Sequence, residues 1–455
     1  MKGYDKEKSV WRRMNEEQRE AVHAYGERYK AFLDTARTER LAVKELIRQA
    51  EAEGFKPLEA YTELKAGDKV YWNQKGKSLI LGVVGARPIT DGLKIVGAHV
   101  DSPRLDAKGN AVVEKNGIVY LKTHYYGGIK KYQWVCQPLS LIGVAHKADG
   151  TAVEISIGED PADPALYITD ILPHLGKDQA EKKVGEAIEG EMLMPLLGLY
   201  SEEEKTKPAI LALLKEKYDL EEEDLVTAEL EVIPAQKAQD VGLDRSMIAA
   251  HGHDDRVCAY AAWEALKTAQ PGEYMQIAVF ADKEEIGSYG NTGMSASYFL
   301  DFLAECLHLA GQDGEIWLRR TLRRSEVLSA DVTAALDPNF ASVHDPENVA
   351  YLGFGPAICK YTGARGKSGS NDANAEFIAK VRRIFNTAQV PWQISELGKV
   401  DQGGGGTIAF IMAQWGCEVV DCGTAMLSMH APVEIVAKTD AYTTSLAYKA
   451  FFESN

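Results

Sequence analysis

Apolar residues with helical spacing alternate with short apolar runs from residue 245 onward. The spacing predicts helices over residues 256–269, 373–387 and 407–415. The apolar runs predict buried strands over residues 275–280, 327–332 and 418–422. Because strands and helices that alternate along a chain favour a mainly parallel sheet with helices on both faces, we expect an α/β fold in this part of the chain.

The first half of the chain changes its pattern near residue 69. Residues 9–54 are rich in Glu, Arg, Ala and Lys, and the spacing of their apolar positions predicts one or two amphipathic helices. Short apolar runs then predict strands, among them residues 78–84 and 93–97. We expect these strands to join the sheet of the second half, so that the strand-like, turn-rich segment after residue 103 is an insertion. The charged stretch over residues 176–224 is interpreted as solvated surface.

Length and composition narrow the class of protein. The 455 residues predict two or three domains, and 45% hydrophobic with 26% charged residues is typical of a soluble globular protein. A net charge of −16 argues against nucleic acid or an anionic membrane as a partner, because both attract basic surfaces. The six cysteines have no Cys-x-x-Cys spacing, and the sequence shows neither a signal segment nor an apolar stretch of membrane-spanning length. We therefore expect a cytoplasmic protein with free thiols.

Two adjacent glutamates, Glu284 and Glu285, follow the predicted strand over residues 275–280. Open α/β sheets carry their chemistry beyond the carboxyl ends of strands. Two like charges this close are tolerated if a cation holds one carboxylate while the other accepts a proton, or if one is protonated. A pair of solvated surface glutamates is the ordinary alternative.

Other elements place potential ligands in similar positions. His99 and Asp101 follow the strand over residues 93–97, and in such a His-x-Asp pair the imidazole can bind a metal while the carboxylate orients it. Asp254, directly before a predicted helix, could bridge two ions or act as the helix N-cap. His251 and His253 are interpreted as neighbours of the site.

Two residues complete the set: Asp331 lies within the predicted strand over residues 327–332, and His430 lies beyond another apolar run. Two imidazoles and three carboxylates can hold two zinc-like ions that share one carboxylate, and a further carboxylate can act as base. A chance gathering of the whole set is less probable than a chance match of any one motif.

Five motifs resemble those of the M18 metalloaminopeptidases, a family that includes aspartyl aminopeptidase and vacuolar aminopeptidase I. The motifs are Gly97-Ala-His-Val-Asp-Ser-Pro-Arg104, Asp254-Asp-Arg256, Asp282-Lys-Glu-Glu-Ile-Gly-Ser288, Ser329-Ala-Asp331 and Met429-His430. The resemblance spans nearly the whole chain and keeps the order of the motifs. It implies a proteolytic α/β domain of the dinuclear zinc peptidase type, residues 1–103 and 245–455, interrupted by a β-rich dimerisation domain, residues 104–244. It also implies that dimers assemble into a tetrahedral dodecamer.

The resemblance implies roles for individual residues. It assigns two ligands to each ion and one to both: His99 with Asp331, Glu285 with His430, and the bridging Asp254. Asp254 is preferred to Asp255 because the ligand in the family pattern is followed directly by Asp or Asn. Glu284 becomes the general base and Asp101 orients His99. The expected cofactors are two divalent ions, with zinc favoured and cobalt or manganese able to substitute.

Four further features bear on the substrate. His174 resembles a family histidine that reaches the active site of a neighbouring subunit, and Lys360 resembles a lysine near the substrate; an ordinary loop histidine and a solvated strand-end lysine are the alternatives. The run Gly403–Gly406 could offer backbone N–H groups to a substrate or be only a flexible connection. Residues 134–138 lack the acidic residues associated with aspartyl aminopeptidase, which favours the aminopeptidase I branch.

The sequence thus predicts a zinc-dependent aminopeptidase that releases N-terminal residues from peptides through a metal-activated water and a glutamate base. One alternative is a dinuclear metal deacylase of N-acylated amino acids. Another is a self-assembling structural shell with a vestigial site, and the complete set of ligands and base argues against it. The preferred N-terminal residue does not follow from motif spacing.

Overall fold

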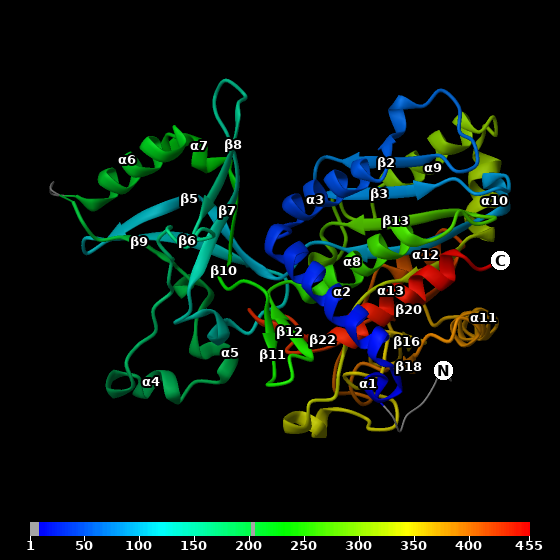
Figure 1. The fold of residues 1–455 in the computed structure, drawn as a ribbon. Coiled ribbons are helices and arrows are strands. Elements are labelled where there is room, and N and C mark those ends of the chain that lie inside the picture. Colours follow the sequence, from blue (N-terminus) through cyan, green and yellow to red (C-terminus); the bar gives the residue numbers. More distant parts are fainter. Residues whose placement is uncertain (1–8, 202–204) are drawn as a thin grey trace. The chain divides into compact units, whose positions relative to one another are not determined.

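The computed structural model describes residues 9–201 and 205–455, which form two compact units (Figure 1). Unit 1 comprises the chain up to residue 101 together with residues 238–429 and 434–455. Unit 2 comprises residues 102–237 and 430–433. Among the described residues, none of the helices combines the length and the apolar character that a membrane span requires.

A mixed sheet organises unit 1, and in the described part of the chain it has nine strands. In spatial order these are β1 (Lys56–Pro57), β2 (Lys69–Gln74), β3 (Ser78–Val83), β13 (Met275–Ala281), β4 (Leu93–His99), β14 (Glu326–Ser329), β20 (Glu418–Gly423), β16 (Ala357–Cys359) and β18 (Gln393–Ile394). Neighbours among β13, β4, β14 and β20 are parallel, so these strands end at one edge of the sheet. The expected parallel centre is confirmed, and β14 ends at Ser329, so Asp331 lies beyond the strand rather than within it.

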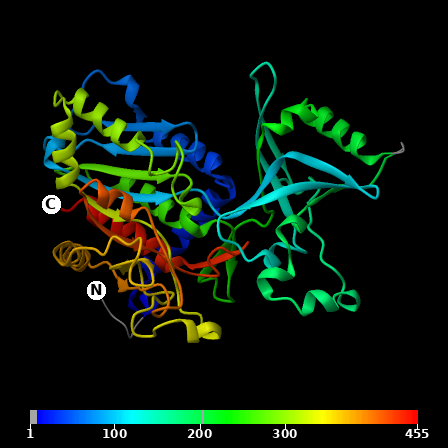
Figure 2. The same cartoon turned by 180° about the vertical axis from the view of Figure 1, so that it is seen from behind.

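Helices pack on both faces of this sheet (Figures 1 and 2). One face carries α2 (Glu16–Thr35), α3 (Glu39–Ala52), α8 (His253–Thr268), α11 (Ala375–Thr387) and α13 (Lys438–Phe452). The other carries α9 (Tyr298–Leu309), α10 (Glu315–Arg324) and α12 (Ala409–Gln414). Along β13, Ala278 and Phe280 belong to the first core and Ile277 and Val279 to the second, as the two-residue period of a strand requires.

The N-terminal helices form where local signals favour them. The short α1 (Val10–Arg13) precedes α2, which begins at a capping box formed by Asn15 and Gln18. The buried aromatic side chains of α2 then pack on α8, where Tyr29 and Phe32 lie 5.4 and 4.9 Å from the ring of Tyr260. Full burial of one such aromatic side chain contributes about 1.5–3 kcal/mol, so these contacts fix the position of α8.

A smaller sheet of unit 1 leads into α8. Its strands in order are β11 (Gln239–Val241), β12 (Met247–Ala250), β22 (Glu434–Ala437), β21 (Ala425–Leu427) and β15 (Thr333–Ala334). Ala250, the last residue of β12, pairs with Glu434, the first residue of β22. A two-stranded ribbon joins β17 (Gly363–Ala364) to β19 (Gly404–Gly405). The register of β12 on β22 therefore decides where α8 begins.

Unit 2 is built on an antiparallel sheet with its own core. Its strands in order are β8 (Ala152–Ile157), β7 (Leu139–His146), β10 (Glu229–Pro234), β5 (Arg104–Lys115), β6 (Ile118–Tyr126) and β9 (Leu196–Gly198). Its helices are α4 (Lys177–Ala180), α5 (Val184–Ala187), α6 (Thr206–Tyr218) and α7 (Glu222–Val226). The charged stretch over residues 176–224 supplies most of these helices, and Leu220 and Leu225 join the core.

Candidate metal centre

The candidate centre lies in unit 1, at the edge where the parallel strands end. His99 is the last residue of β4, and Asp331 follows β14 by two residues. The chain leaves β13 and enters a 3-10 turn, η6 (Glu284–Ile286), whose first two residues are the adjacent glutamates. Asp254 comes from the first turn of α8.

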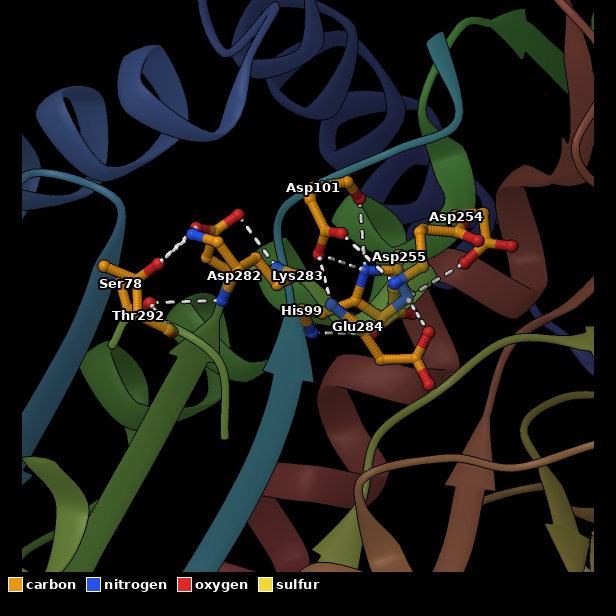
Figure 3. A network of polar contacts seen from close by, with 10 residues as sticks. Ser78, His99, Asp101, Asp254, Asp255, Asp282, Lys283, Glu284 and Thr292 are labelled. Atoms are coloured by element: carbon orange, nitrogen blue, oxygen red, sulfur yellow. Dashed lines mark hydrogen bonds and ion pairs between the residues drawn. The ribbon is translucent and has the colours of Figure 1, made fainter. Parts of the chain in front are cut away.

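Two groups of side chains place potential ligand atoms within 4.8 Å of one another. His99, Asp254 and Glu285 form the first group, and His99, Glu284 and Asp331 form the second. His99 Nε2 lies 3.2 Å from Asp254 Oδ1 and 3.9 Å from Glu284 Oε2 (Figure 3). His99 and Asp254 are buried, whereas the two glutamates and Asp331 are partly exposed. The structure therefore brings together all the candidate ligands of unit 1 and the candidate base.

His430 belongs to unit 2. It opens the short segment 430–433, and its Nδ1 lies 2.8 Å from the carbonyl oxygen of Gly128 in the same unit. Neither group of potential ligands found among the described residues contains His430. Its assignment as a ligand stays a prediction.

Asp101 holds both the histidine and the glutamates. His99 Nδ1 lies 3.1 Å from the carbonyl oxygen of Asp101 and 3.3 Å from its Oδ1. The backbone N–H groups of Glu284 and Glu285 donate to Asp101 Oδ1 and Oδ2, each at 3.1 Å. The role of Asp101 toward His99 was expected from the sequence. Its role toward the glutamates was not, because no local pattern indicates which distant N–H groups a carboxylate will accept.

The contacts of His99 also define its tautomer. A carbonyl oxygen only accepts hydrogen bonds, so Nδ1 carries a proton, and Nε2 is the nitrogen that faces Asp254 and Glu284 and is left to bind a cation or a second proton. A lone pair that faces two carboxylates repels them unless a proton or a cation lies between.

Two further buried carboxylates hold the backbone of the candidate ligands. The N–H of His99 donates to Asp255 Oδ2 at 3.2 Å, and the N–H of Asp254 donates to Glu434 Oε2 at 3.0 Å. Asp255 is fully buried and Glu434 is 1% exposed. Neither role was expected from the sequence: Glu434 lies 180 residues from Asp254 and matches no motif.

A separate network fixes the turn that carries the glutamates (Figure 3). The side chain of Asp282, which is 1% exposed, accepts from the backbone N–H and the ammonium of Lys283 at 2.8 and 2.7 Å and from the hydroxyl of Thr292 at 2.6 Å. The ammonium of Lys283 also donates to that hydroxyl. Lys283 has a φ of 65°, a conformation unfavourable for a non-glycine residue, and these contacts offset its cost.

The histidines near Asp254 play another part. His253 is fully buried, with Nδ1 2.7 Å from the hydroxyl of Tyr29 and Nε2 3.1 Å from the carbonyl oxygen of Ile248. Burial lowers the pKa of His253 to about 3, so the ring is neutral. His253 is a core residue with both ring nitrogens engaged, in agreement with its interpretation as a neighbour of the site. His251 is buried as well.

Several acidic side chains lie close together in the centre and shift the pKa values of one another and of His99. Burial alone lowers the pKa of His99, but Asp101, Asp254 and Glu284 raise it well above its ordinary value. Burial, followed by repulsion from Glu284 and Asp255, raises the pKa of Asp331 well above its ordinary value. Without cations the centre thus holds its protons more strongly than free side chains do.

This donor set fits divalent cations. One imidazole nitrogen and four carboxylates converge, which suits zinc. The described residues supply seven carboxyl groups to the centre and its immediate supports: Asp101, Asp254, Asp255, Glu284, Glu285, Asp331 and Glu434. Cations between the ligands would offset a repulsion that proton uptake otherwise relieves.

The remaining candidates lie elsewhere. His174 is exposed on η4 (Pro173–Leu175) of unit 2. Lys360 is exposed directly after β16 of unit 1, where its carbonyl oxygen accepts from the N–H of Ala373 at 2.9 Å. Two of the four glycines of the run 403–406 form β19. A role of His174 and Lys360 in substrate binding stays a prediction.

Comparisons with known proteins give a consistent result. The model of the family described as "Aminopeptidase I zinc metalloprotease (M18)" matches residues 32–452. A protein of Clostridium acetobutylicum named "Probable M18 family aminopeptidase 1" is 49% identical over 456 residues, with 98% of each chain covered.

Solved structures agree in fold. The crystal structure of an M18 family aminopeptidase from Thermotoga maritima superimposes with a TM-score of 0.95 at 45% identity, covering 98% of this chain and 99% of that chain. The crystal structure of aminopeptidase I from Clostridium acetobutylicum superimposes with a TM-score of 0.93 at 46% identity, covering 99% of this chain and 100% of that chain.

Proposed function

Since the chain belongs to the M18 family of aminopeptidase I zinc metalloproteases, we propose that it is a dinuclear zinc aminopeptidase that removes N-terminal residues from peptides. The observation that carries the proposal is the pair of ligand groups that share His99. In this assignment His99 and Asp331 hold one ion, Glu285 and His430 hold the other, and Asp254 bridges them. Unit 1 is the proteolytic domain.

The charge of the centre supports two ions rather than one. A single divalent ion would leave most of the seven carboxyl groups uncompensated, and in an interior of low dielectric constant each uncompensated carboxylate must instead take up a proton. Two divalent ions would offset more of this negative charge and so favour the ionised forms of the metal-binding carboxylates and of the base. Cobalt or manganese could occupy the same ligands.

Glu284 is the general base in this proposal. Divalent ions held by these ligands would lower the pKa of a bound water toward about 7 and polarise the scissile carbonyl. Glu284 accepts the proton of the attacking water and delivers it to the leaving amine. Asp101 keeps Glu284 in place through its backbone N–H and keeps the lone pair of His99 Nε2 directed into the centre. Of the two adjacent glutamates, Glu285 thus binds an ion and Glu284 transfers the proton.

The proposal extends to substrate and assembly. The substrate is a peptide with a free N-terminus, and His174 and Lys360 are proposed substrate contacts. Unit 2 is proposed to mediate dimerisation, with dimers forming a dodecamer in the cytoplasm. A solved structure from S. cerevisiae that is described as a dodecamer has this fold, with a TM-score of 0.75 at 18% identity over 94% of this chain and 96% of that chain.

A comparison of Glu284→Gln with Glu285→Gln tests the assignment. Glu284→Gln should retain two zinc ions per chain and lose turnover, because an amide cannot accept the proton. Glu285→Gln should bind fewer ions, because an amide is a poorer metal ligand than a carboxylate. Metal content is measured by elemental analysis and turnover with peptides that begin with Leu, Asp, Glu or Lys, before and after chelation. Full activity of Glu284→Gln would remove that residue from its role.

Blocked peptides distinguish the other functions. Equal hydrolysis of N-acylated and free-amine peptides would favour a deacylase. A large assembly of the wild-type chain without bound metal or peptidase activity would favour a structural shell. The aminopeptidase proposal requires metal-dependent hydrolysis that is confined to free-amine peptides.

A further inference from the structure

We infer that Glu434 is a positioning residue for the candidate metal centre and holds the bridging ligand Asp254 through its backbone. The inference rests on the proposed function, because it concerns the ligands of that centre. Glu434 does not belong to either group of potential ligands found among the described residues. Its carboxylate accepts a hydrogen bond from the backbone N–H of Asp254, so it would influence bound ions only through that ligand.

The burial of Glu434 is the first argument. A carboxyl group that is 1% exposed is costly to bury unless it is hydrogen-bonded, so a glutamate at this position needs a compensating role. The N–H of Asp254 donates to Glu434 Oε2 at 3.0 Å. A hydrogen bond to an ionised acceptor is stronger than one between neutral groups.

The geometry around Asp254 also points to this role. Its backbone N–H is bound by Glu434, and its Oδ1 lies 3.2 Å from His99 Nε2. The flanking residue Gly252, the N-cap of α8, supplies no side-chain cap. An acceptor from β22 thus holds the backbone of Asp254, and a small shift of that backbone would move the bridging carboxylate.

The place of Glu434 in the chain supports the same role. Glu434 begins β22 and pairs there with Ala250, the residue from which the chain runs to Asp254. It also follows the proposed ligand His430 by four residues. Glu434 is thus connected to both ligand-bearing segments. The chain itself links it to His430, and the pairing of β22 with β12 links it to the segment that carries Asp254.

A plain structural role would differ in its effects. A carboxylate that only caps α8 stabilises the folded chain and leaves metal affinity unchanged. A partner that orients a ligand, by contrast, typically changes metal affinity or activity by about 10- to 100-fold when it is removed. Metal affinity therefore separates the two roles where folding stability alone does not.

The test compares Glu434→Leu and Glu434→Gln with the wild-type chain. Leu removes the acceptor, whereas Gln keeps an oxygen that can still accept from Asp254. We expect Glu434→Leu to lower zinc affinity by about 10- to 100-fold and turnover by a similar factor with little change in KM. Glu434→Gln should lie between Leu and the wild type. Zinc affinity is measured by competition with a chelating dye, and the cobalt-substituted protein gives a visible absorption band that reports ligand geometry.

Asp440→Leu is the matched control. Asp440 is also a fully buried carboxylate that accepts backbone N–H groups, from Gly353 and Gly355 at 2.7 and 2.8 Å, and it belongs to neither group of potential ligands. Its substitution should lower the free energy of unfolding without changing zinc affinity or the cobalt spectrum. If Glu434→Leu does not fold, a weakened zinc affinity of Glu434→Gln still supports the inference.

Three outcomes overturn the inference. Wild-type zinc affinity and cobalt spectrum in Glu434→Leu would reduce Glu434 to a helix cap. The same result in Glu434→Gln would do so if the Leu variant does not fold. A wild-type chain that binds no zinc would overturn the proposed function together with this inference, whereas an active wild type with unaffected variants would overturn only the role of Glu434.

Discussion

Asp101→Asn is the substitution that tests the organisation of the centre most directly. Both carboxylate oxygens of Asp101 are engaged, because Oδ1 accepts from the N–H of Glu284 and Oδ2 from that of Glu285 at 3.1 Å each. Asparagine keeps one acceptor oxygen and replaces the other with an NH₂ group. One glutamate N–H would then face a donor, and His99 would lose part of its partner at Nδ1.

The expected magnitude follows from these contacts. A buried N–H without an acceptor costs about 1–3 kcal/mol, which is the expected fall in the free energy of unfolding. The loss of a partner that orients a metal ligand lowers affinity or activity by about 10- to 100-fold. A displacement of the base by about 1 Å can cost a further factor of about 100. Turnover should therefore fall at least about 100-fold while the chain still folds.

The assay pairs turnover and zinc content with unfolding in urea. Asp440→Asn is the control, because Asp440 also accepts two backbone N–H groups while fully buried. It should lose similar stability and keep wild-type turnover. Wild-type turnover in Asp101→Asn, with a stability loss like that of the control, would refute the claim that Asp101 organises the glutamates.

Two further predictions concern pH. Burial lowers the pKa of Lys94 to about 8, despite its ion pair with Glu326 at 2.7 Å. Above pH 8 the folded chain has therefore lost the proton of Lys94, whereas the unfolded chain keeps it up to about pH 10.5. Stability from this group therefore rises with pH across that window, and Lys94→Met should abolish the rise in urea unfolding curves; an unchanged slope would contradict the burial argument. For His253, whose pKa burial lowers to about 3, the unfolded chain binds a proton near pH 6.5 that the folded chain excludes, so this group destabilises the fold as pH falls from 6.5 to 3. His253→Gln should show a shallower acid loss and wild-type zinc content, and loss of zinc would make His253 a ligand after all.

The sequence revealed the candidate ligands because their spacing relative to apolar runs is a local property. His99 ends β4 and Glu284 follows β13, and these two strands lie next to each other and run parallel, so their side chains had to meet at one edge of the sheet. The helix and strand positions of the second half followed for the same reason. Residues 330–332 were predicted to be part of a strand, and this was wrong because an apolar run indicates burial rather than a strand. Ala330 and Val332 are buried but lie outside β14.

The supports of the centre could not be predicted in this way. Asp101, Asp255 and Glu434 act by accepting backbone N–H groups, and every residue except proline offers such a group. Nothing in a side chain's identity shows which N–H it will meet. Lys283, whose φ of 65° is stabilised by Asp282, is a second case, since its type gives no sign of that conformation.

The sequence by itself thus determined the family, the types of ligand and the sheet edge at which they gather, because motif and periodicity are written along the chain. Only the tertiary structure decided which acids converge in the candidate centre and which hold the backbone behind them. That division depends on the register of β12 on β22 and on the turn after β13, where residues about 180 positions apart come within hydrogen-bonding distance.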